Sequence, residues 1–191
     1  MLFLGFFASS LGVDRVGQGS RRNEEGREGI FDGYCQNSWF FVFLHLKRIL
    51  DAMIEFEAKG VEIPEWDTAK MCRWLEAVAA SHDRTVGNVN YLFCDDEEIL
   101  DANRKFIGHD YYTDIITFDY SSGRRIGGDV LISLDTVASN AELLGVSYEE
   151  ELRRVVVHGV LHLCGIDDKG PGEREIMEQA EDQALALYKN I

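Results

Sequence analysis

The sequence predicts an α+β domain: a small mixed sheet of four strands packed with helices around one central metal-binding helix. Three observations lead to this fold. Short alternating or β-branched segments are typical of strands, and segments with apolar residues every three or four positions are typical of helices. One apolar helix also carries His158 and His162 a helical turn apart. The 191 residues, 46% of them hydrophobic, suffice for one sizeable core.

Four segments are predicted to be strands. Residues 53–58 alternate apolar and acidic side chains, as in a half-exposed strand. Residues 88–94 place Val, Tyr and Phe on one face, and residues 113–120 are rich in β-branched and aromatic side chains. Residues 128–132 complete the set.

Five segments are predicted to be helices, beginning near residues 67, 95, 133, 147 and 171. The second is expected to run through Phe106. The apolar period of the first places Met71, Trp74, Leu75, Val78 and Ala79 in the core. The third is expected to bury Leu134, Val137, Ala138, Ala141 and Leu144, and the last Ile176, Met177, Ala180, Ala184 and Leu187.

The fourth helix needs its own argument, because its three successive valines at 155–157 alone would favour a strand. Ser147, followed three residues later by Glu150, has the pattern of a capping box. Gly165 follows the last apolar position and can end the helix. The segment between these two signals is therefore predicted to be helical.

The first 52 residues differ from the rest. They carry six of the 19 Lys and Arg and six of the 34 Asp and Glu, so the net charge of -15 belongs to residues 53–191. Residues 17–33 have a disordered composition, and the apolar run 39–46 is too short to span a bilayer. We expect residues 1–52 to be a non-native or disordered extension, with translation starting at Met53. A partner-binding or membrane-surface arm is the alternative.

Charge and cysteine content restrict the function. A net charge of -15 argues against non-specific binding to nucleic acid or anionic membranes, so RNA handling would need a local basic patch or a metal ion. Cys35, Cys72, Cys94 and Cys164 form no C-x-x-C pair. They are expected to be small buried side chains in a protein of the reducing cytosol.

His158, His162 and Asp168 are predicted to bind a metal ion. Residues at i and i+4 share a helix face, so both imidazoles can point at one spot. Gly165 can turn the chain back, and Asp168 then closes on the same spot. Two nitrogens and one oxygen with an open position describe a catalytic zinc-type site.

Gly159 adds two inferences. A zinc protease with the H-E-x-x-H pattern needs glutamate at this position as general base, so glycine argues against a peptidase. Glycine inside a helix costs about 1 kcal/mol relative to alanine. Its presence therefore predicts that another group approaches the helix closely at the site.

The pattern H-G-x-L-H-L-x-G, followed by an acidic segment, resembles the YbeY family of bacterial endoribonucleases and rRNA maturation factors. The resemblance extends over most of residues 53–191. Its matching positions are His158, Gly159, Leu161, His162, Leu163, Gly165 and Asp167, with Asn103, Phe106, Thr113, Asp114, Phe118, Gly128, Asp129, Ile132 and Ser133 upstream.

The resemblance implies a single metal-dependent domain at 53–191 that cleaves single-stranded RNA in the cytoplasm. It implies a role in maturing the 3′ end of 16S rRNA and in ribosome quality control, with rRNA and the small ribosomal subunit as partners and neither DNA nor membrane. One Zn²⁺ per chain is expected, although other divalent transition metals fit. A non-catalytic ribosome-assembly factor with a structural metal is the alternative.

Two positions depart from the family pattern. Its third metal-ligand histidine falls on Asp168, and its usual arginine falls on Ile107. Aspartate is a competent zinc ligand, and the neighbouring Asp167 is a candidate partner to the ligands. The catalytic group is not identified beyond a metal-bound water. Candidate phosphate-binding cations are Arg104, Lys105, Arg124 and Arg125, whereas His109 and Asp110 fit turn chemistry better than a cleft.

Overall fold

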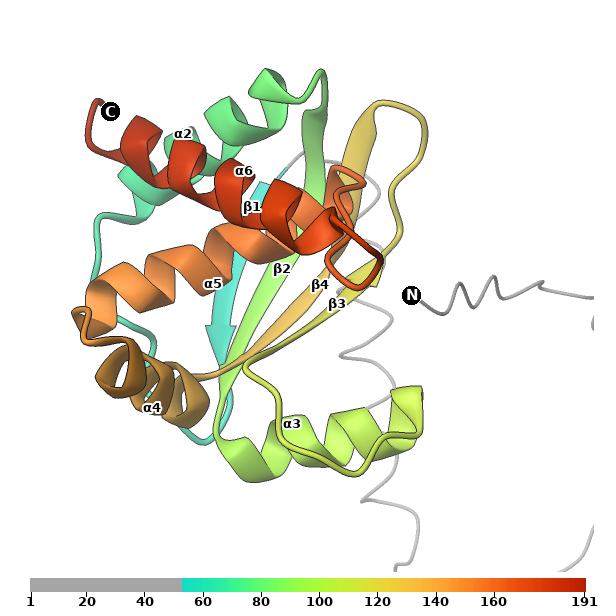
Figure 1. Cartoon of the computed structure of the whole chain (residues 1–191), viewed down its shortest axis with the longest axis vertical. Coiled ribbons are helices and arrows are strands. Elements are labelled where there is room, and N and C mark those ends of the chain that lie inside the picture. The colour runs from blue at the N-terminus through green and yellow to red at the C-terminus, as the bar shows by residue number, and fades with distance from the viewer. Residues whose placement is uncertain (1–52) are drawn as a thin grey trace, which may run out of the picture. The chain divides into compact units, whose positions relative to one another are not determined.

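The computed structural model describes residues 53–191, so the predictions for residues 1–52, including Cys35, lie outside the described part. Strands and helices are mixed along the first part of the chain, and three consecutive helices follow the last strand (Figure 1). They are β1 (Met53–Ala58), α2 (Thr68–Ser81), β2 (Thr85–Cys94), α3 (Asp96–Ala102), the π-helical turn η1 (Asn103–Ile107), β3 (Ile115–Asp119), β4 (Arg125–Ser133), α4 (Leu134–Leu144), α5 (Tyr148–Leu163) and α6 (Glu173–Tyr188).

The four strands form one mixed sheet, as the sequence predicts, in the order β1-β2-β4-β3. β1 and β4 both run parallel to β2, and β3 is antiparallel to β4 at the edge. The parallel pair β1 and β2 is joined through α2, because parallel neighbours need a crossover connection. The antiparallel pair needs only the short turn between β3 and β4.

The two faces of the sheet carry separate apolar clusters. Tyr91 and Val130 belong to the larger cluster, which also includes buried residues of α2, α5 and α6. Cys94 and Ile116 belong to the smaller cluster, together with buried residues of α3. Because successive side chains in a strand point to opposite faces, α5 and α3 cover opposite faces of the sheet.

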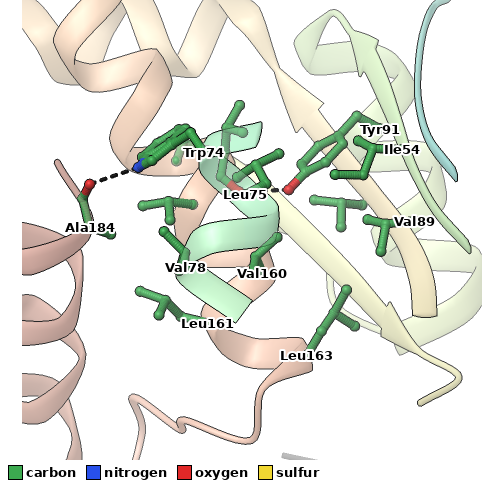
Figure 2. Close-up of a cluster of buried hydrophobic side chains, with 14 of the residues drawn as sticks. Ile54, Trp74, Leu75, Val78, Val89, Tyr91, Val160, Leu161, Leu163 and Ala184 are labelled. Atoms are coloured by element: carbon green, nitrogen blue, oxygen red, sulfur yellow. Dashed lines mark hydrogen bonds between the residues drawn. The ribbon is translucent and has the colours of Figure 1, made fainter. Parts of the chain in front are cut away.

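Two buried side-chain hydrogen bonds join elements of the larger cluster (Figure 2). The indole Nε1 of Trp74 donates to the carbonyl of Ala184 at 2.7 Å, which joins α2 to α6. The hydroxyl of Tyr91 donates to the carbonyl of Val156 at 3.0 Å, which joins β2 to α5. Buried Trp and Tyr need such partners, and here the partners tie the helices and the sheet together around α5.

The predicted strands and caps are present with shifted bounds. β2 and β4 begin three residues earlier than expected, at Thr85 and Arg125, whereas β3 is confined to Ile115–Asp119. All five predicted core positions of α2 are buried. Ser133 caps α4 by accepting from the amide of Thr136, and Gly145 follows its end.

Other predictions need correction. The helix expected through Phe106 is present, but only Asp96–Ala102 is α-helical, and the chain continues as the π-helical turn from Asn103 to Ile107. Ala138, Leu144 and Ile176 were expected inside but are exposed, because α4 and α6 each have too narrow an inward stripe to bury every apolar side chain. Within residues 53–191, none of the helices combines the length and apolar character that crossing a bilayer requires.

Candidate metal centre

The helix that carries both histidines begins where the sequence predicts. The side chain of Ser147 accepts a hydrogen bond from the amide of Glu150 at 3.2 Å, which is the N-cap half of the capping box. Three acidic residues in the first turn suit its positive end. Val155, Val156 and Val157 are buried in the helix, so capping and tertiary packing outweigh their preference for strands.

Gly159 brings α5 close to the sheet. A Cβ atom at this position would lie 2.8 Å from Cγ1 of Val130 and 3.2 Å from Cδ1 of Ile115. The close approach predicted from the sequence is therefore confirmed, but the approaching groups belong to β4 and β3. Because residue 159 has no side chain, α5 can pack closely against β3 and β4, and this close packing determines how far His158 lies from the sheet.

The chain reverses direction directly after the C-terminal end of α5. The amide of Gly165 donates to the carbonyl of His162 at 2.9 Å, and the amide of Ile166 donates to that of Leu161 at 3.1 Å. This pair of bonds is a Schellman motif. Gly165 has φ +96°, a left-handed conformation that suits glycine. The motif reverses the chain, so Asp168 returns toward the histidines.

The structure brings the three predicted ligands together. Nε2 of His158 lies 3.7 Å and Nε2 of His162 lies 3.9 Å from Oδ2 of Asp168. The candidate ligand atoms of the three residues all lie within 4.8 Å of one another. All three side chains are partly exposed, which leaves the group accessible from solvent. This group could hold a metal ion.

The other nitrogen of each imidazole is already engaged. Nδ1 of His162 lies 2.9 Å from the carbonyl oxygen of Ile166, and Nδ1 of His158 lies 2.7 Å from Oε1 of Glu181. Both partners are acceptors, so each neutral ring carries its proton on Nδ1 and a lone pair on Nε2. That tautomer is the one required for coordination through Nε2, and the donor set therefore fits a divalent transition metal.

Glu181 is a site residue that sequence reasoning missed. Its carboxylate is buried, binds His158 through Oε1 and accepts from Nη1 of Arg154 at 2.9 Å through Oε2. Burial alone would raise the pKa of Glu181, but these two hydrogen bonds and the charges of the same partners bring it below its usual value. Glu181 is thus an anion that orients His158.

Arg154 could have been found from the sequence as a residue near the site, because it lies four residues before His158 and therefore on the same face of α5. It also binds Oδ1 of Asp182 at 3.1 Å. Glu181 could not be found in this way, because it lies 23 positions after His158 and on a separate helix. Glutamates are frequent along α6, and helical period alone does not single out this one.

The electrostatics of His162 favour the neutral ring. Burial, and to a lesser extent the neighbouring His158, lower the pKa of His162. The hydrogen bond to the carbonyl of Ile166 and the negative charges of Asp168 and Asp167 raise this pKa and offset part of the shift. A neutral imidazole is the ligand form of histidine. Asp167 thus acts on His162 through its charge, and Asp168 supplies the carboxylate oxygen of the ligand group.

The four candidate phosphate-binding cations lie in two places. Arg104 and Lys105 are exposed in η1, and Arg104 is paired with Asp110 at 2.6 Å. Arg124 and Arg125 are exposed at the β3–β4 turn. That turn adjoins the end of α5, because Arg84 donates from Nη1 to the carbonyl of Gly123 and from Nη2 to that of Cys164.

Two of the three cysteines in the described part are buried, as the sequence predicts. Cys94 and Cys164 are buried, and Cys72 is half-buried. Burial raises the pKa of Cys164 to about 11, with Arg84 opposing the shift and Asp119 adding to it. The thiol beside the site is therefore protonated and small, and it does not belong to the His158, His162 and Asp168 group.

The fold and the site define a class: an α+β protein whose buried central helix presents a candidate metal centre of two imidazoles and one carboxylate. The family model described as endoribonuclease YbeY matches residues 53–189. The chain belongs to this family.

Curated relatives agree with the family match. The endoribonuclease YbeY of Phocaeicola vulgatus is 56% identical over 135 residues, covering 71% of this chain and 98% of its own. That of Bacteroides thetaiotaomicron is 54% identical over 134 residues, covering 70% and 98%. A solution structure from Thermotoga maritima covers 72% of this chain and 93% of its own, at 24% identity and a TM-score of 0.48.

Proposed function

We propose that this protein is a metal-dependent endoribonuclease that cleaves single-stranded RNA, acting in 16S rRNA 3′-end maturation and ribosome quality control. Membership of a family described as endoribonuclease supports the nuclease activity. The observation that carries the metal dependence is the convergence of His158, His162 and Asp168 within 4.8 Å. The proposed partners are rRNA and the small ribosomal subunit, and the proposed location is the cytoplasm.

His158 and His162 would hold the metal through Nε2, and Asp168 through Oδ2. A bound Zn²⁺ supplies Lewis-acid polarisation of a phosphoryl oxygen and lowers the pKa of a water molecule. Glu181 and the Ile166 carbonyl keep the proton of each imidazole on Nδ1. Asp168 adds a negative charge, which favours a dication at this position.

Few cations are available to bind the negatively charged phosphates of an RNA substrate. Arg104, Lys105, Arg124 and Arg125 are exposed on an otherwise acidic protein, and each can orient a phosphate. Ile107 is an apolar side chain where the resembling family has an arginine, so it contributes no charge. The proposal therefore assigns phosphate binding to these four exposed cations.

The test compares wild type with His162→Ala, both loaded with Zn²⁺, on single-stranded and duplex RNA. We expect cleavage of the single strand by wild type and loss of at least the 10²-fold typical of a removed catalytic contribution in the variant. Glu178→Gln, an exposed change on α6, is the matched control and should cleave normally. Equal cleavage by wild type and His162→Ala would contradict the proposal.

A non-catalytic assembly factor is the second candidate. The observation that favours it is the engagement of the cations by acidic neighbours: Arg104 pairs with Asp110 at 2.6 Å, and Arg124 pairs with Asp83 at 3.3 Å. Such a factor would bind the small ribosomal subunit with metal present, and His162→Ala would lose stability but have no activity to lose. Absence of RNA cleavage by metal-loaded wild type, with subunit binding intact, would favour this candidate.

A further inference from the structure

The segment between α3 and β4 carries an exposed aromatic surface. In the part of the chain that the structure describes, every aromatic residue that is more than half exposed lies in this one segment. They are Phe106, Tyr111, Tyr112 and Tyr120, at 55%, 56%, 59% and 58% exposure. The large exposed apolar residues elsewhere in residues 53–191 are aliphatic. A concentration of rings in one segment indicates a binding surface for flat ligands rather than general surface composition.

The backbone beneath these rings is pinned. The buried side chain of Asn103 donates from Nδ2 to the carbonyl of Tyr111 at 2.9 Å, which closes the loop across eight residues. Nε of Arg104 donates to Oδ1 of Asp110 at 2.6 Å, which forms a second closure. The loop also contains the π-helical turn, a feature frequent at functional sites. A pinned loop holds its rings ready for a ligand at low entropic cost.

Two of the rings are oriented by aromatic neighbours. Phe106 meets Phe118 of β3 edge to face, with centroids 5.8 Å apart. Tyr111 stacks on His109, with centroids 5.2 Å apart and an interplanar angle of 24°. The hydroxyl of Tyr111 and Nδ1 of His109 are hydrogen-bonded at 3.0 Å. His109 is therefore part of this ordered surface, which the sequence did not indicate.

The aromatic surface and the candidate metal centre both adjoin the edge strand β3. Phe106 packs on Phe118 of β3, and Tyr112 precedes Ile115 of β3 by three residues, a span of at most about 10 Å. Ile115 Cδ1 lies 3.2 Å from the Cβ position of Gly159, the residue next to His158. Because α3 and α5 cover opposite faces of the sheet, an RNA strand that contacts both the rings and the metal ligands has to pass around this edge.

The net charge of the protein favours RNA bases, rather than phosphates, as the groups that bind to the aromatic surface. The chain has a net charge of -15, so release of counterions from a phosphate backbone can supply little of the affinity for RNA. Stacking of unpaired bases on aromatic rings requires no protein charge. Lys105, whose Nζ lies 5.0 Å from the centroid of Phe106, places one cation within the same surface for a phosphate.

We propose that Phe106, Tyr111 and Tyr112 form a stacking subsite for unpaired RNA bases, with Lys105 contacting the backbone. This inference rests on the proposed function and specifies how its substrate is held. Because duplex RNA has no free base faces apart from its ends, the subsite selects single strands. Most of the binding affinity comes from stacking, so binding depends only weakly on salt.

The experiment measures binding separately from cleavage. The full-length protein is titrated, with a chelator present, into a fluorescent single-stranded RNA of about 12 nucleotides and into a duplex of the same sequence. We expect Tyr111→Ala and Tyr112→Ala each to weaken single-strand binding by about 5- to 150-fold. Tyr112→Phe keeps the ring and should bind like wild type. Leu143→Ala, which removes an exposed aliphatic side chain on α4, is the surface control.

Salt dependence distinguishes stacking from charge. Tyr112→Ala should leave the slope of log affinity against log salt unchanged, whereas Lys105→Ala should reduce its magnitude by about 0.7. Wild-type binding by both tyrosine variants, or equal binding of duplex and single strand, would overturn the subsite, as would a wild type that binds no RNA. Unchanged RNA binding with loss of a protein partner would assign the rings to that partner.

Failure of the subsite and failure of the nuclease proposal have different signatures. Cleavage of single-stranded RNA by metal-loaded wild type, together with ring-independent binding, would overturn the subsite alone. Ring-dependent binding without metal-dependent cleavage would overturn the nuclease proposal and retain the subsite.

Discussion

Glu181 Oε1 lies 2.7 Å from Nδ1 of His158, although the two residues are on different helices. Nη1 of Arg154 holds the other oxygen of the same carboxylate at 2.9 Å. The candidate metal centre therefore depends on the packing of α6 against α5. The ligand motif lies wholly in α5 and the turn after it, but the orientation of one ligand is set from outside the motif.

Replacing Glu181 tests this dependence. Glu181→Ala is expected to weaken metal binding by about 10- to 100-fold, because His158 loses the acceptor that fixes its tautomer and ring orientation. Competition with a chromophoric chelator measures the affinity. Asp182→Asn is the matched control, since Asp182 contacts Arg154 in the same ion-pair group and is largely exposed. Equal affinities of these two variants would show that the hydrogen bond to His158 has no effect.

Asp168 and Asp167 provide a second comparison. Asp168→Ala should lose metal far more completely than Asp167→Ala, because only Asp168 supplies an oxygen to the ligand group. Asp168→His should retain metal, since imidazole is also a zinc ligand. Elemental analysis of the purified variants gives the metal content per chain. Similar metal content in the two alanine variants would show that the ligand assignment is wrong.

Replacing Gly159 by alanine, which adds the smallest side chain, should destabilise the protein. Gly159→Ala gains about 1 kcal/mol of helix propensity, but its Cβ would lie 2.8 Å from Val130 Cγ1, and overpacking costs about 1–3 kcal/mol. We expect a net loss of about 1 kcal/mol in the free energy of unfolding, measured in urea. Val130→Ala removes the clashing methyl groups, so a double-mutant cycle should show favourable coupling of at least about 0.5 kcal/mol. Additive effects would contradict this explanation.

Glu151 predicts a pH dependence of stability. It is buried at 4% exposure, and its Oε2 has no hydrogen-bond partner. Burial raises the pKa of Glu151, Arg154 opposes the shift, and Asp114, Glu181 and Glu150 add to it. The native state therefore holds this proton more tightly than the unfolded chain does. Protonated Glu151 therefore contributes to the free energy of unfolding. This contribution is fully present below the pKa that Glu151 has in the unfolded chain, and it is lost as the pH rises through the pKa that Glu151 has in the folded protein.

Glu151→Gln keeps the shape and removes the ionisation. The variant should gain stability relative to wild type at pH 8 and lose that advantage toward pH 4. Urea unfolding at both values measures the difference. Glu149→Gln, an exposed neighbour that is not among the charges acting on Glu151, is the control and should show no such trend. A constant difference between Glu151→Gln and wild type at all pH values would exclude titration of Glu151 as its cause.

Local signals predicted much of this fold. The helix starts near residues 67, 95, 133 and 147 were predictable because each depends on local bonding: Asp67, Asp95, Ser133 and Ser147 each accept a hydrogen bond from the amide three residues further along the chain. Helical and strand periods are equally local. The positions of all four strands and the residues of the candidate metal group followed from them.

Features that depend on packing between distant segments were not predicted. Ala138, Leu144 and Ile176 fit an apolar period, but no element of residues 53–191 covers them. The π-helical turn after Ala102 is closed by the amide of Gly108 donating to the carbonyl of Asn103, and the loop after it is held by the side chain of Asn103 donating to the carbonyl of Tyr111. Hydrophobic periodicity contains no information on either bond. The sheet order was also hidden, because pairing between strands depends on the path of the chain.

By itself, then, the sequence determined that His158 and His162 share a helix face and that a glycine turn returns an aspartate toward them, since spacing within a few residues sets these relations. Only the tertiary structure decided how the site is supported. Gly159 faces Val130 because α5 lies on the sheet, and Glu181 reaches His158 because α6 lies on α5. Such contacts join residues far apart along the chain, and their geometry exists only once the apolar surfaces between the elements have been buried.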